Sequence, residues 1–272
     1  MADTRLILAG CGKMGGAMLQ GWLRRGIAAA NVRVVEPFDA GRQAAADQFG
    51  VEALASPAEV PDSFAPDVVV FAVKPQSMDD VAPAYRRFAG PDTVFLSIAA
   101  GKPLAYFEAA LGADAAIVRS MPNTPAAVGR GITVACANGR VNDAQRDLCD
   151  ELLRAVGEVA WVDDEGLIDA VTALSGGGPA YVFLLAESLA EAGAAAGLPP
   201  DLAKRLARVT VAGSGELLYR SSDEPETLRR NVTSPGGTTA EALKVLMGED
   251  GWQPLLTRAI AAATRRSREL AG

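Results

Sequence analysis

Short apolar runs alternate with amphipathic stretches from the N-terminus to about residue 162, and this alternation constrains the fold more than any other feature of the chain. Strands that alternate with helices are typical of βαβ units, which build a mainly parallel, doubly wound sheet. The run 68–73 is apolar at consecutive positions, as expected of a strand covered on both faces. The predicted strands are 5–9, 32–36, 68–73, 93–97, 115–119, 131–137 and 158–162, and the predicted helices between them include 14–25, 41–49, 76–88 and 143–156.

The pattern changes after Asp163 and Asp164, where the chain becomes rich in Ala, Leu and Glu and predicts no further strand. The segment 181–186 is apolar on nearly all sides, unlike a surface helix with one buried face. The segment 181–186 must therefore be covered on several sides, and a second subunit is a simple way to cover it. We therefore expect a sheet domain over 1–163 and an all-helical domain over 164–272, through which the chain forms a dimer or a higher homo-oligomer. The predicted helices are 164–174, 178–195, 200–220, 225–230, 236–247 and 252–270.

Composition argues against a nucleic-acid partner and against a membrane span. The formal charge of −7 and the pI near 4.8 oppose a large nucleic-acid footprint. No apolar run approaches the roughly 18 residues of a membrane span, and the first apolar stretch stops at Gly10, too soon for a secretory signal. Cys11, Cys136 and Cys149 are an odd, widely spaced set, which favours a reducing cytoplasm over a disulfide framework.

The chain contains no histidine. Histidine triads, histidine proton relays and histidine metal sites are therefore excluded, and three scattered cysteines do not predict a zinc site. We expect no metal. Any catalysis must work without the usual acid and base of neutral pH.

A glycine-rich turn, Gly10-Cys-Gly-Lys-Met-Gly15, follows the first predicted strand and opens the first predicted helix. In that context G-x-G-x-x-G indicates a dinucleotide site: Gly10 permits the tight turn, Gly12 lets the backbone approach a pyrophosphate, and Gly15 lets helix and strand pack closely. The helix N-terminus offers free amides to the phosphates. The expected cofactor contacts here are Gly10, Cys11, Gly12, Lys13 and Met14.

The second strand ends at Glu36, where an acidic residue can bind the adenosine ribose hydroxyls. A carboxylate repels a 2′-phosphate, which favours NADH over NADPH, but Arg42 offers an alternative partner for that phosphate. In the simpler interpretation Glu36 only ends a strand and Arg42 is solvated. The cofactor is therefore expected to be NADPH or NADH.

Two other segments lie at predicted carboxyl ends of strands, where ligands of open α/β sheets bind. They are 70–75, which ends in Lys74 and Pro75, and 97–101. Lys74 reads either as a cofactor contact or as a solvated charge at the end of a strand. The expected contacts are Ala72, Val73, Lys74, Pro75 and Ala99.

Several motifs in this order resemble the pyrroline-5-carboxylate reductase family, whose members complete proline biosynthesis. The resemblance runs from about residue 5 to about 255, and 232–239 is its most specific part. It implies a Rossmann-type domain, a helical domain that interlocks with a partner subunit, and reduction of a cyclic imine by NAD(P)H. Two positions depart from the family pattern: Gly177 stands in place of the usual Ser, and Glu36 is atypical of members that prefer NADPH. The motifs are 10–15, 73–76, 97–101, 119–125, 174–181 and 232–239.

The segment 234–239 reads as an N-cap serine, a first-turn proline and two glycines that lead into a helix. Glycines let a carboxylate approach the backbone amides, and the helix dipole favours it. An ordinary capped helix is the simpler interpretation of these residues alone. The resemblance implies a substrate role and places Thr239 beside the substrate nitrogen, where we expect it to orient the imine as the catalytic residue. The expected substrate contacts are Asn123, Ser234, Gly236, Gly237, Thr238 and Thr239.

Asn123 lies in the segment 121–125, which we expect near the nicotinamide, and structural and substrate roles are both open for it. Two alternatives to an imine reductase of this family stay open. A β-hydroxyacid dehydrogenase or a related imine reductase generally uses a lysine on the first long interdomain helix, and 103–203 contains none. A dimer that binds a dinucleotide without turnover is the other alternative.

Overall fold

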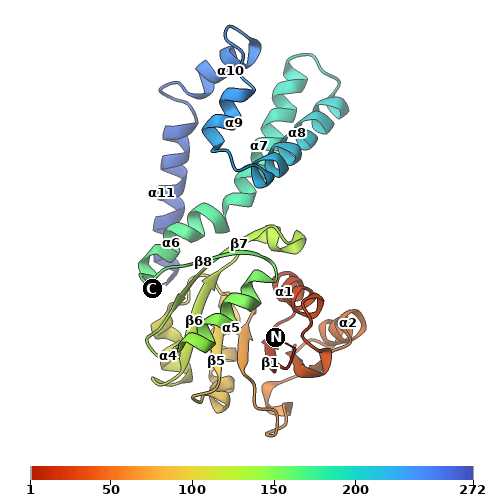
Figure 1. Ribbon diagram of the computed structural model, residues 1–272, viewed down its shortest axis with the longest axis vertical. Coiled ribbons are helices and arrows are strands. Elements are labelled where there is room, and N and C mark those ends of the chain that lie inside the picture. The colour runs from red at the N-terminus through yellow and green to blue at the C-terminus, as the bar shows by residue number, and fades with distance from the viewer. Residues whose placement is uncertain (1, 272) are drawn as a thin grey trace. The chain divides into compact units, whose positions relative to one another are not determined.

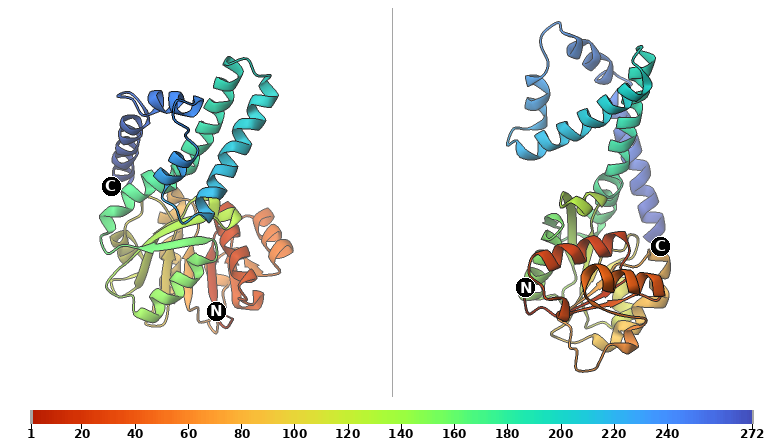
Figure 2. Two further views of the ribbon diagram at one scale, coloured as in Figure 1. Left: turned by 45° about the horizontal axis from the view of Figure 1, so that its top comes forward. Right: turned by 90° about the vertical axis from the view of Figure 1, so that its right-hand side faces the viewer.

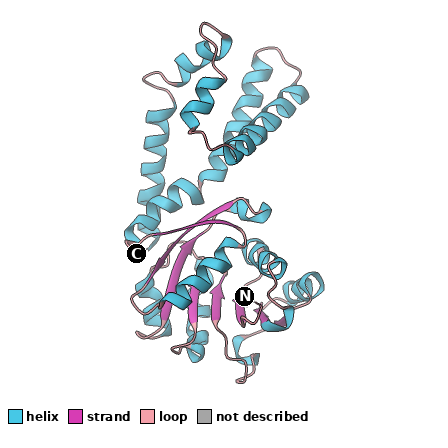
Figure 3. Ribbon diagram, in the orientation of Figure 1, coloured by secondary structure: helices cyan, strands magenta, loops and turns pink. Residues whose placement is uncertain are grey.

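The computed structural model describes residues 2–271, and its strands form one eight-stranded sheet (Figure 3). The order is β3-β2-β1-β4-β5-β6-β7-β8, parallel throughout except where β7 pairs antiparallel with β6. Chain order reverses between the neighbours β1 and β4, and ligands of such sheets bind at this switch point. The strands are β1 (Leu6–Ala9), β2 (Val32–Val35), β3 (Glu52–Leu54), β4 (Val68–Phe71), β5 (Val94–Ser97), β6 (Ala116–Met121), β7 (Gly131–Ala137) and β8 (Gly157–Trp161).

Helices cover both faces of the sheet (Figure 1), as the consecutive apolar residues of the central strands require. Alternate strand residues pack on opposite sides: Leu6 and Leu8 join the core under α1 and α5, whereas Ile7 joins the core under α3 and α4. This confirms the predicted doubly wound, mainly parallel α/β fold. The helices of this part are α1 (Lys13–Arg24), α2 (Asp39–Phe49), α3 (Met78–Val81), α4 (Leu104–Leu111), α5 (Asp143–Arg154) and α6 (Ile168–Val171).

Three local predictions differ from the structure. The strand β3 was not predicted, because it is a three-residue edge strand that opens with an exposed Glu52. The expected helix 76–88 is broken into 3-10 turns around α3, and Pro83, which has no amide hydrogen, lies in the second turn. The strand β6 continues beyond the expected residue 119 to Met121, because its last residues pair with β7.

The chain divides into two compact units, residues 1–176 with 263–272 and residues 177–262. This division falls later than the expected boundary at 163 and 164. Glu165 forms a partly buried ion pair with Arg119 at 2.7 Å and accepts the backbone N–H of Leu104 at 2.8 Å. Ile168 in α6 is also buried in the core of the sheet. The segment that follows β8 is therefore fastened to the sheet before the second unit begins.

The last residues of the chain also belong to the first unit. The hydroxyl of Ser267 donates to the Asp169 carboxylate at 2.6 Å. Gly101 lies against Leu270, since a Cβ at Gly101 would be 3.3 Å from the Leu270 carbonyl oxygen. Helix α11 (Trp252–Ala271) thus begins in the second unit and ends in the first.

The second unit consists of helices alone among its described residues, and α7 and α8 lie side by side (Figure 2). Many of its apolar side chains are exposed, among them Phe183, Leu206 and Leu217. The helical stretch Glu165–Ala195 is long and apolar enough to pass a test for a membrane span, with 11% of the tested window buried. The helices of this unit match the predicted ranges closely and are α7 (Gly178–Ala195), α8 (Pro200–Arg220), α9 (Pro225–Asn231), α10 (Thr238–Leu246) and the first part of α11.

Two glycines of α1 give a paired test of the packing between α1 and α5. A Cβ at Gly21 would lie 2.7 Å from the carbonyl oxygen of Ala155, whereas a Cβ at Gly16 would meet nothing closer than 3.9 Å. We expect Gly21→Ala to destabilise the protein by roughly 1–3 kcal/mol through overpacking. Gly16→Ala should be neutral or stabilise it by up to about 1 kcal/mol through helix propensity. Denaturant unfolding of both variants measures the difference, and equal stabilities would contradict the packing described here.

Candidate functional site

The glycine turn packs so tightly that two of its glycines cannot be replaced without movement. Gly10 has a φ of +88°, and a Cβ there would lie 2.8 Å from Val73 Cγ1. A Cβ at Gly15 would lie 2.4 Å from the carbonyl oxygen of Gly10. The turn is thus wedged between the end of β1, the start of α1 and the residues that follow β4, as the sequence predicts for the first and third glycines.

Gly12 differs from its neighbours because a Cβ at this position would meet nothing within 4 Å. It is the N-cap of α1, and no side chain forms a capping hydrogen bond there. The first amides of α1 therefore face open space next to a backbone that lacks a side chain. This cradle fits the pyrophosphate of a dinucleotide, which helix N-termini bind through free amides and the helix dipole.

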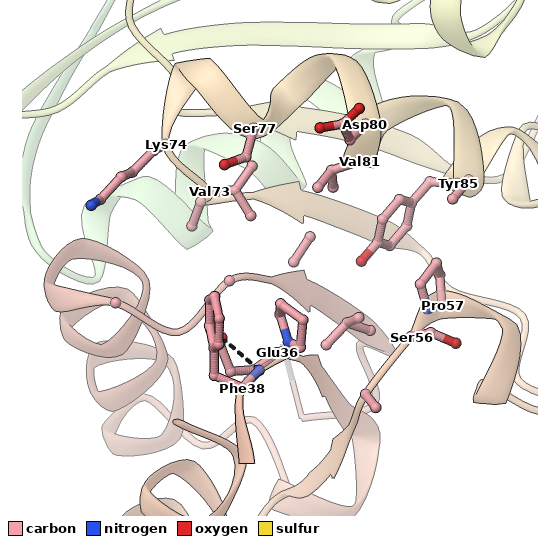
Figure 4. A pocket seen from close by; sticks show the side chains of 18 residues that line it. Glu36, Phe38, Ser56, Pro57, Val73, Lys74, Ser77, Asp80, Val81 and Tyr85 are labelled. Atoms are coloured by element: carbon pink, nitrogen blue, oxygen red, sulfur yellow. Dashed lines mark hydrogen bonds between the residues drawn. The ribbon is translucent and has the colours of Figure 1, made fainter. Parts of the chain in front are cut away.

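A cavity of about 510 Å³ extends from the glycine turn past the end of β2. Glu36 and Phe38 line one side of it, and Asp80 and Tyr85 line the other (Figure 4). Phe38 is 73% exposed, so its ring is available to a ligand. Burial raises the pKa of Tyr85, which keeps the phenol neutral. The cavity combines two carboxylate residues, Glu36 and Asp80, with the aromatic surface of Phe38 and Tyr85, which suits an adenosine.

The carboxylate of Glu36 and the guanidinium of Arg42 are held differently. Glu36 accepts weak hydrogen bonds from the backbone N–H groups of Cys11 at 3.3 Å and Phe38 at 3.4 Å, the latter drawn in Figure 4. Arg42 donates to the carbonyl oxygens of Glu36 at 2.9 Å and Pro37 at 2.8 Å and pairs with Asp39. Arg42 is not among the residues that line the cavity. Glu36 therefore lines the cavity, whereas the Arg42 guanidinium is bonded to residues 36, 37 and 39 and does not line it.

A second cavity of about 320 Å³ adjoins the first, because Ala72, Val73 and Lys74 line both. It is formed by Met14 of α1 and by the segments that follow β4, β5 and β6. Nearly all the predicted cofactor contacts are thus brought together along one edge of the sheet. The residues of this group that line one or both cavities are Gly10, Gly12, Met14, Glu36, Ala72, Val73, Lys74, Pro75 and Ala99.

Cys11 and Lys13 line neither cavity. Lys13 is exposed at the first position of α1. Burial and, to a smaller extent, the Glu36 carboxylate raise the pKa of the Cys11 thiol to about 11. Cys11 is therefore a neutral thiol at physiological pH, and its backbone N–H donates to the Glu36 carboxylate.

Asn123 lines the second cavity, and its side chain is used within the chain. Its Oδ1 accepts the backbone N–H of Ile132 in β7 at 3.0 Å, and its Nδ2 donates to the carbonyl oxygen of Ser175 at 3.2 Å. Ser175 belongs to a π-helical turn, Thr172–Gly176, whose last residue also lines the cavity. In the sequence, the glycines 176–178 are the one local sign of an irregular turn here.

The remaining predicted substrate residues lie in the second unit, in the loop between α9 and α10 and at the first two positions of α10. The expectation that Ser234 is the N-cap of the helix is wrong, since the N-cap is Gly237 and α10 begins at Thr238. Pro235 and Gly236 instead form a tight turn, in which Gly236 has a φ of +69° and the Gly237 N–H donates to the Ser234 carbonyl oxygen at 3.0 Å. Proline followed by a glycine with positive φ is typical of a type II turn.

The N-terminus of α10 is nevertheless available to an anion. No side chain forms a capping hydrogen bond at Gly237, and Ser234, Gly236, Thr238 and Thr239 are exposed in the single chain. The backbone amides at the start of α10 thus lack a side-chain acceptor. Free amides at a helix N-terminus are donors that an anion can use, and here a turn and not a serine cap precedes them.

Sequence reasoning missed several residues of the first cavity. Phe38, Asp80 and Tyr85 line it, yet they lie outside any motif. Only the alternation of strands and helices could have indicated them, because Asp80 and Tyr85 follow β4 and Phe38 follows β2 at the same edge of the sheet.

The fold and the two adjoining cavities define an NAD(P)H-dependent oxidoreductase with a Rossmann-type sheet and a helical second part. Residues 6–101 match the family model described as NADP oxidoreductase, coenzyme F420-dependent, and residues 165–270 match that described as pyrroline-5-carboxylate reductase dimerisation. Pyrroline-5-carboxylate reductase of Pseudomonas aeruginosa is 42% identical over 272 residues, which cover 100% of this chain and 98% of that protein. The chain belongs to the pyrroline-5-carboxylate reductase family, which confirms the resemblance seen in its motifs.

Solved structures agree with this assignment. A pyrroline-5-carboxylate reductase from Coxiella burnetii matches with a TM-score of 0.92 and 33% identity, covering 99% of both chains. Plasmodium falciparum pyrroline carboxylate reductase, solved with NADP bound, matches with a TM-score of 0.82 and 29% identity over 100% of both chains.

Gly12 allows the cofactor site to be tested apart from stability. We expect Gly12→Ala to leave the free energy of unfolding within about 1 kcal/mol of the wild type, because its Cβ meets no atom of the chain. The same methyl group occupies the space that a pyrophosphate needs, so the dissociation constant of NADH should rise at least about tenfold.

Fluorescence titration with NADH measures this change, with Gly16→Ala as the control within the same helix. An unchanged dissociation constant in folded Gly12→Ala would show that the dinucleotide binds elsewhere.

Proposed function

We propose that this chain reduces the cyclic imine 1-pyrroline-5-carboxylate to L-proline with NAD(P)H. The observation that carries the proposal is the pair of adjoining cavities along the carboxyl edge of the sheet, with the Gly12 cradle beside them, in a chain of this family. When bound, the cofactor supplies a hydride to the imine carbon. In this proposal the adenosine lies against Glu36 and the nicotinamide lies in the cavity that Asn123 lines.

The substrate carries a carboxylate, and the proposed site for it is the start of α10. Gly236 and Gly237 expose the backbone there, and the amides of Thr238 and Thr239 begin the helix. A carboxylate at a helix N-terminus is stabilised by these donors and by the helix dipole. Glu241 in the same turn pairs with Lys244 at 2.6 Å, which partly offsets its repulsion of an anion. The substrate can thus be held without a dedicated lysine or arginine.

The chain needs no strong acid for this reaction. A protonated imine is already an electrophile, so the residues must mainly bind it and hold it against the reduced cofactor. The proposed role of the Thr239 hydroxyl is to form a hydrogen bond with the substrate nitrogen and so to orient the imine. This agrees with the absence of histidine from the whole sequence.

The preferred cofactor in this proposal is NADH. The Glu36 carboxylate lines the adenosine cavity, where it can accept hydrogen bonds from ribose hydroxyls but repels a 2′-phosphate. Arg42 is the nearby cation that the sequence offered for that phosphate, and its guanidinium is bonded to two carbonyl oxygens and to Asp39. A 2′-phosphate would have to displace these bonds.

The proposed assembly is a homo-oligomer, a dimer or larger, formed through the helices of the second unit. Its support is the match of residues 165–270 to the dimerisation family and the exposed apolar side chains of α7 and α8. A partner subunit, and not a membrane, is the proposed cover for the apolar stretch 165–195. The proposed location is the cytoplasm, in keeping with the free thiols of Cys11, Cys136 and Cys149. The acidic composition favours neither a nucleic-acid nor a membrane partner.

Transfer of an isotope label tests the reaction directly. The wild-type protein, given pyrroline-5-carboxylate and NADH deuterated at C4, should yield proline with deuterium at C5, detected by mass spectrometry and NMR. Parallel rates with NADH and NADPH should give the higher kcat/KM with NADH, because of Glu36. A 3-hydroxy acid with NAD+ is the control for a dehydrogenase. Binding of NADH without turnover of any of these substrates would favour the non-catalytic alternative.

The Thr239 hydroxyl is tested by two substitutions. We expect Thr239→Ala to lower kcat at least about tenfold, on the scale of one lost hydrogen bond in the transition state, with unchanged thermal stability. Thr239→Ser keeps the hydroxyl and should retain most of the activity. Steady-state kinetics with purified variants decide the point, and full turnover by Thr239→Ala would remove this role.

A further inference from the structure

We infer that Asn123 is a positioning residue whose amide fastens the π-helical turn Thr172–Gly176 to the sheet and thereby fixes the wall of the second cavity. The inference deepens the proposed function, because it rests on the assignment of that cavity to the nicotinamide end of the cofactor. It does not depend on which substrate is reduced. It gives Asn123 a task other than direct contact with the substrate.

Asn123 is well suited to join two distant parts of the chain. It is 9% exposed and follows β6 at the carboxyl edge of the sheet. Its carboxamide accepts from Ile132 of β7 and donates to the carbonyl of Ser175. An asparagine side chain is both an acceptor and a donor, so one residue satisfies a backbone amide on one side and a backbone carbonyl on the other.

The π-helical turn needs such a partner. Hydrogen bonds in π-helical turns run from i to i+5, and such turns are rare and concentrate at functional sites. Two hydroxyls bond within this region, since Thr172 donates to the Ile168 carbonyl at 2.7 Å and Ser175 donates to the Val171 carbonyl at 3.0 Å. The bond from Asn123 to Ser175 ties the turn to the loop that follows β6.

The turn and the loop meet at the cavity itself. Gly176 and Met121 both line it, and a Cβ at Gly176 would lie 2.6 Å from Met121 Cε. Movement of the turn away from Asn123 would therefore change the shape of the cavity at the end remote from Glu36. The cavity that Glu36 lines shares no residue with the turn. The inference thus predicts an effect on the nicotinamide end and none on the adenosine end.

Two variants of Asn123 separate the bonds that it forms. Asn123→Leu removes both bonds, whereas Asn123→Asp keeps an acceptor for Ile132 and loses the donor to Ser175. In the ligand-free protein, hydrogen exchange followed by NMR should be at least about tenfold faster over 172–178 in both variants. The amide of Ile132 should exchange faster only in Asn123→Leu. If Asn123 only contacted the substrate, both substitutions would leave the exchange rates over 172–178 and at Ile132 unchanged.

Binding provides the second readout. The dissociation constant of NADH should rise about tenfold in both variants, on the scale of one lost hydrogen bond. That of ADP, which reaches only the cavity of Glu36, should stay within about twofold. Equal losses for NADH and ADP would indicate general damage and overturn the inference, as would wild-type exchange over 172–178.

Hydrogen exchange of the wild-type protein, with and without ligand, provides a test that no folding defect of a variant can affect. NADH should slow exchange over 172–178 and at Ile132, whereas ADP should not. If neither ligand alters these amides, the turn does not wall the nicotinamide site and the inference fails. All of these readouts stand without turnover, so a failure of the proposed imine reduction is distinguishable from a failure of this inference.

Discussion

The packing of the glycine turn is the constraint on which the rest of the site depends. Gly15 lies so near the carbonyl oxygen of Gly10 that a single methyl group would force α1 away from β1. Gly10 in turn presses against Ala72 and Val73 at the end of β4. This three-way contact joins the neighbours β1 and β4, where the order of the sheet reverses. The contact fixes where α1 begins and therefore the direction in which the free amides of α1 point. The space beside Gly12 stays open.

Binding by backbone amides is the common theme of the two proposed anion sites. The amides at the start of α1 would hold the pyrophosphate, and those at the start of α10 would hold the substrate carboxylate. Neither helix has a side-chain cap at its N-terminus. A chain with net charge −7 and no histidine can thus bind two anions without a cluster of cations. A chain without histidine also suits a substrate that is already activated by protonation of its own nitrogen.

The sequence predicted most of the fold, because the central strands β1 and β4 are apolar at every position and the glycine turn follows directly after β1. It also predicted the carboxyl-edge residues, from Ala72 to Ala99, since parallel strands bring their ends together. Local patterns do not show the features that tertiary contacts decide. The ion pair of Arg119 with Glu165 draws residues after 163 onto the sheet, and pairing with β7 lengthens β6. The Pro235-Gly236 turn stands in place of the expected serine cap. Only the glycines 176–178 indicate an irregular turn at Thr172–Gly176, and its bond to Asn123 depends on a contact distant in sequence.

The central claim is that one dinucleotide spans both cavities, with Gly12 at its middle. A crystal structure of the protein with NADH tests this most directly. We expect the adenosine ribose at Glu36, the pyrophosphate over the amides of Gly12 and Lys13, and the nicotinamide between Ala99 and Asn123. A dinucleotide bound away from the glycine turn, or a nicotinamide outside the second cavity, would contradict it.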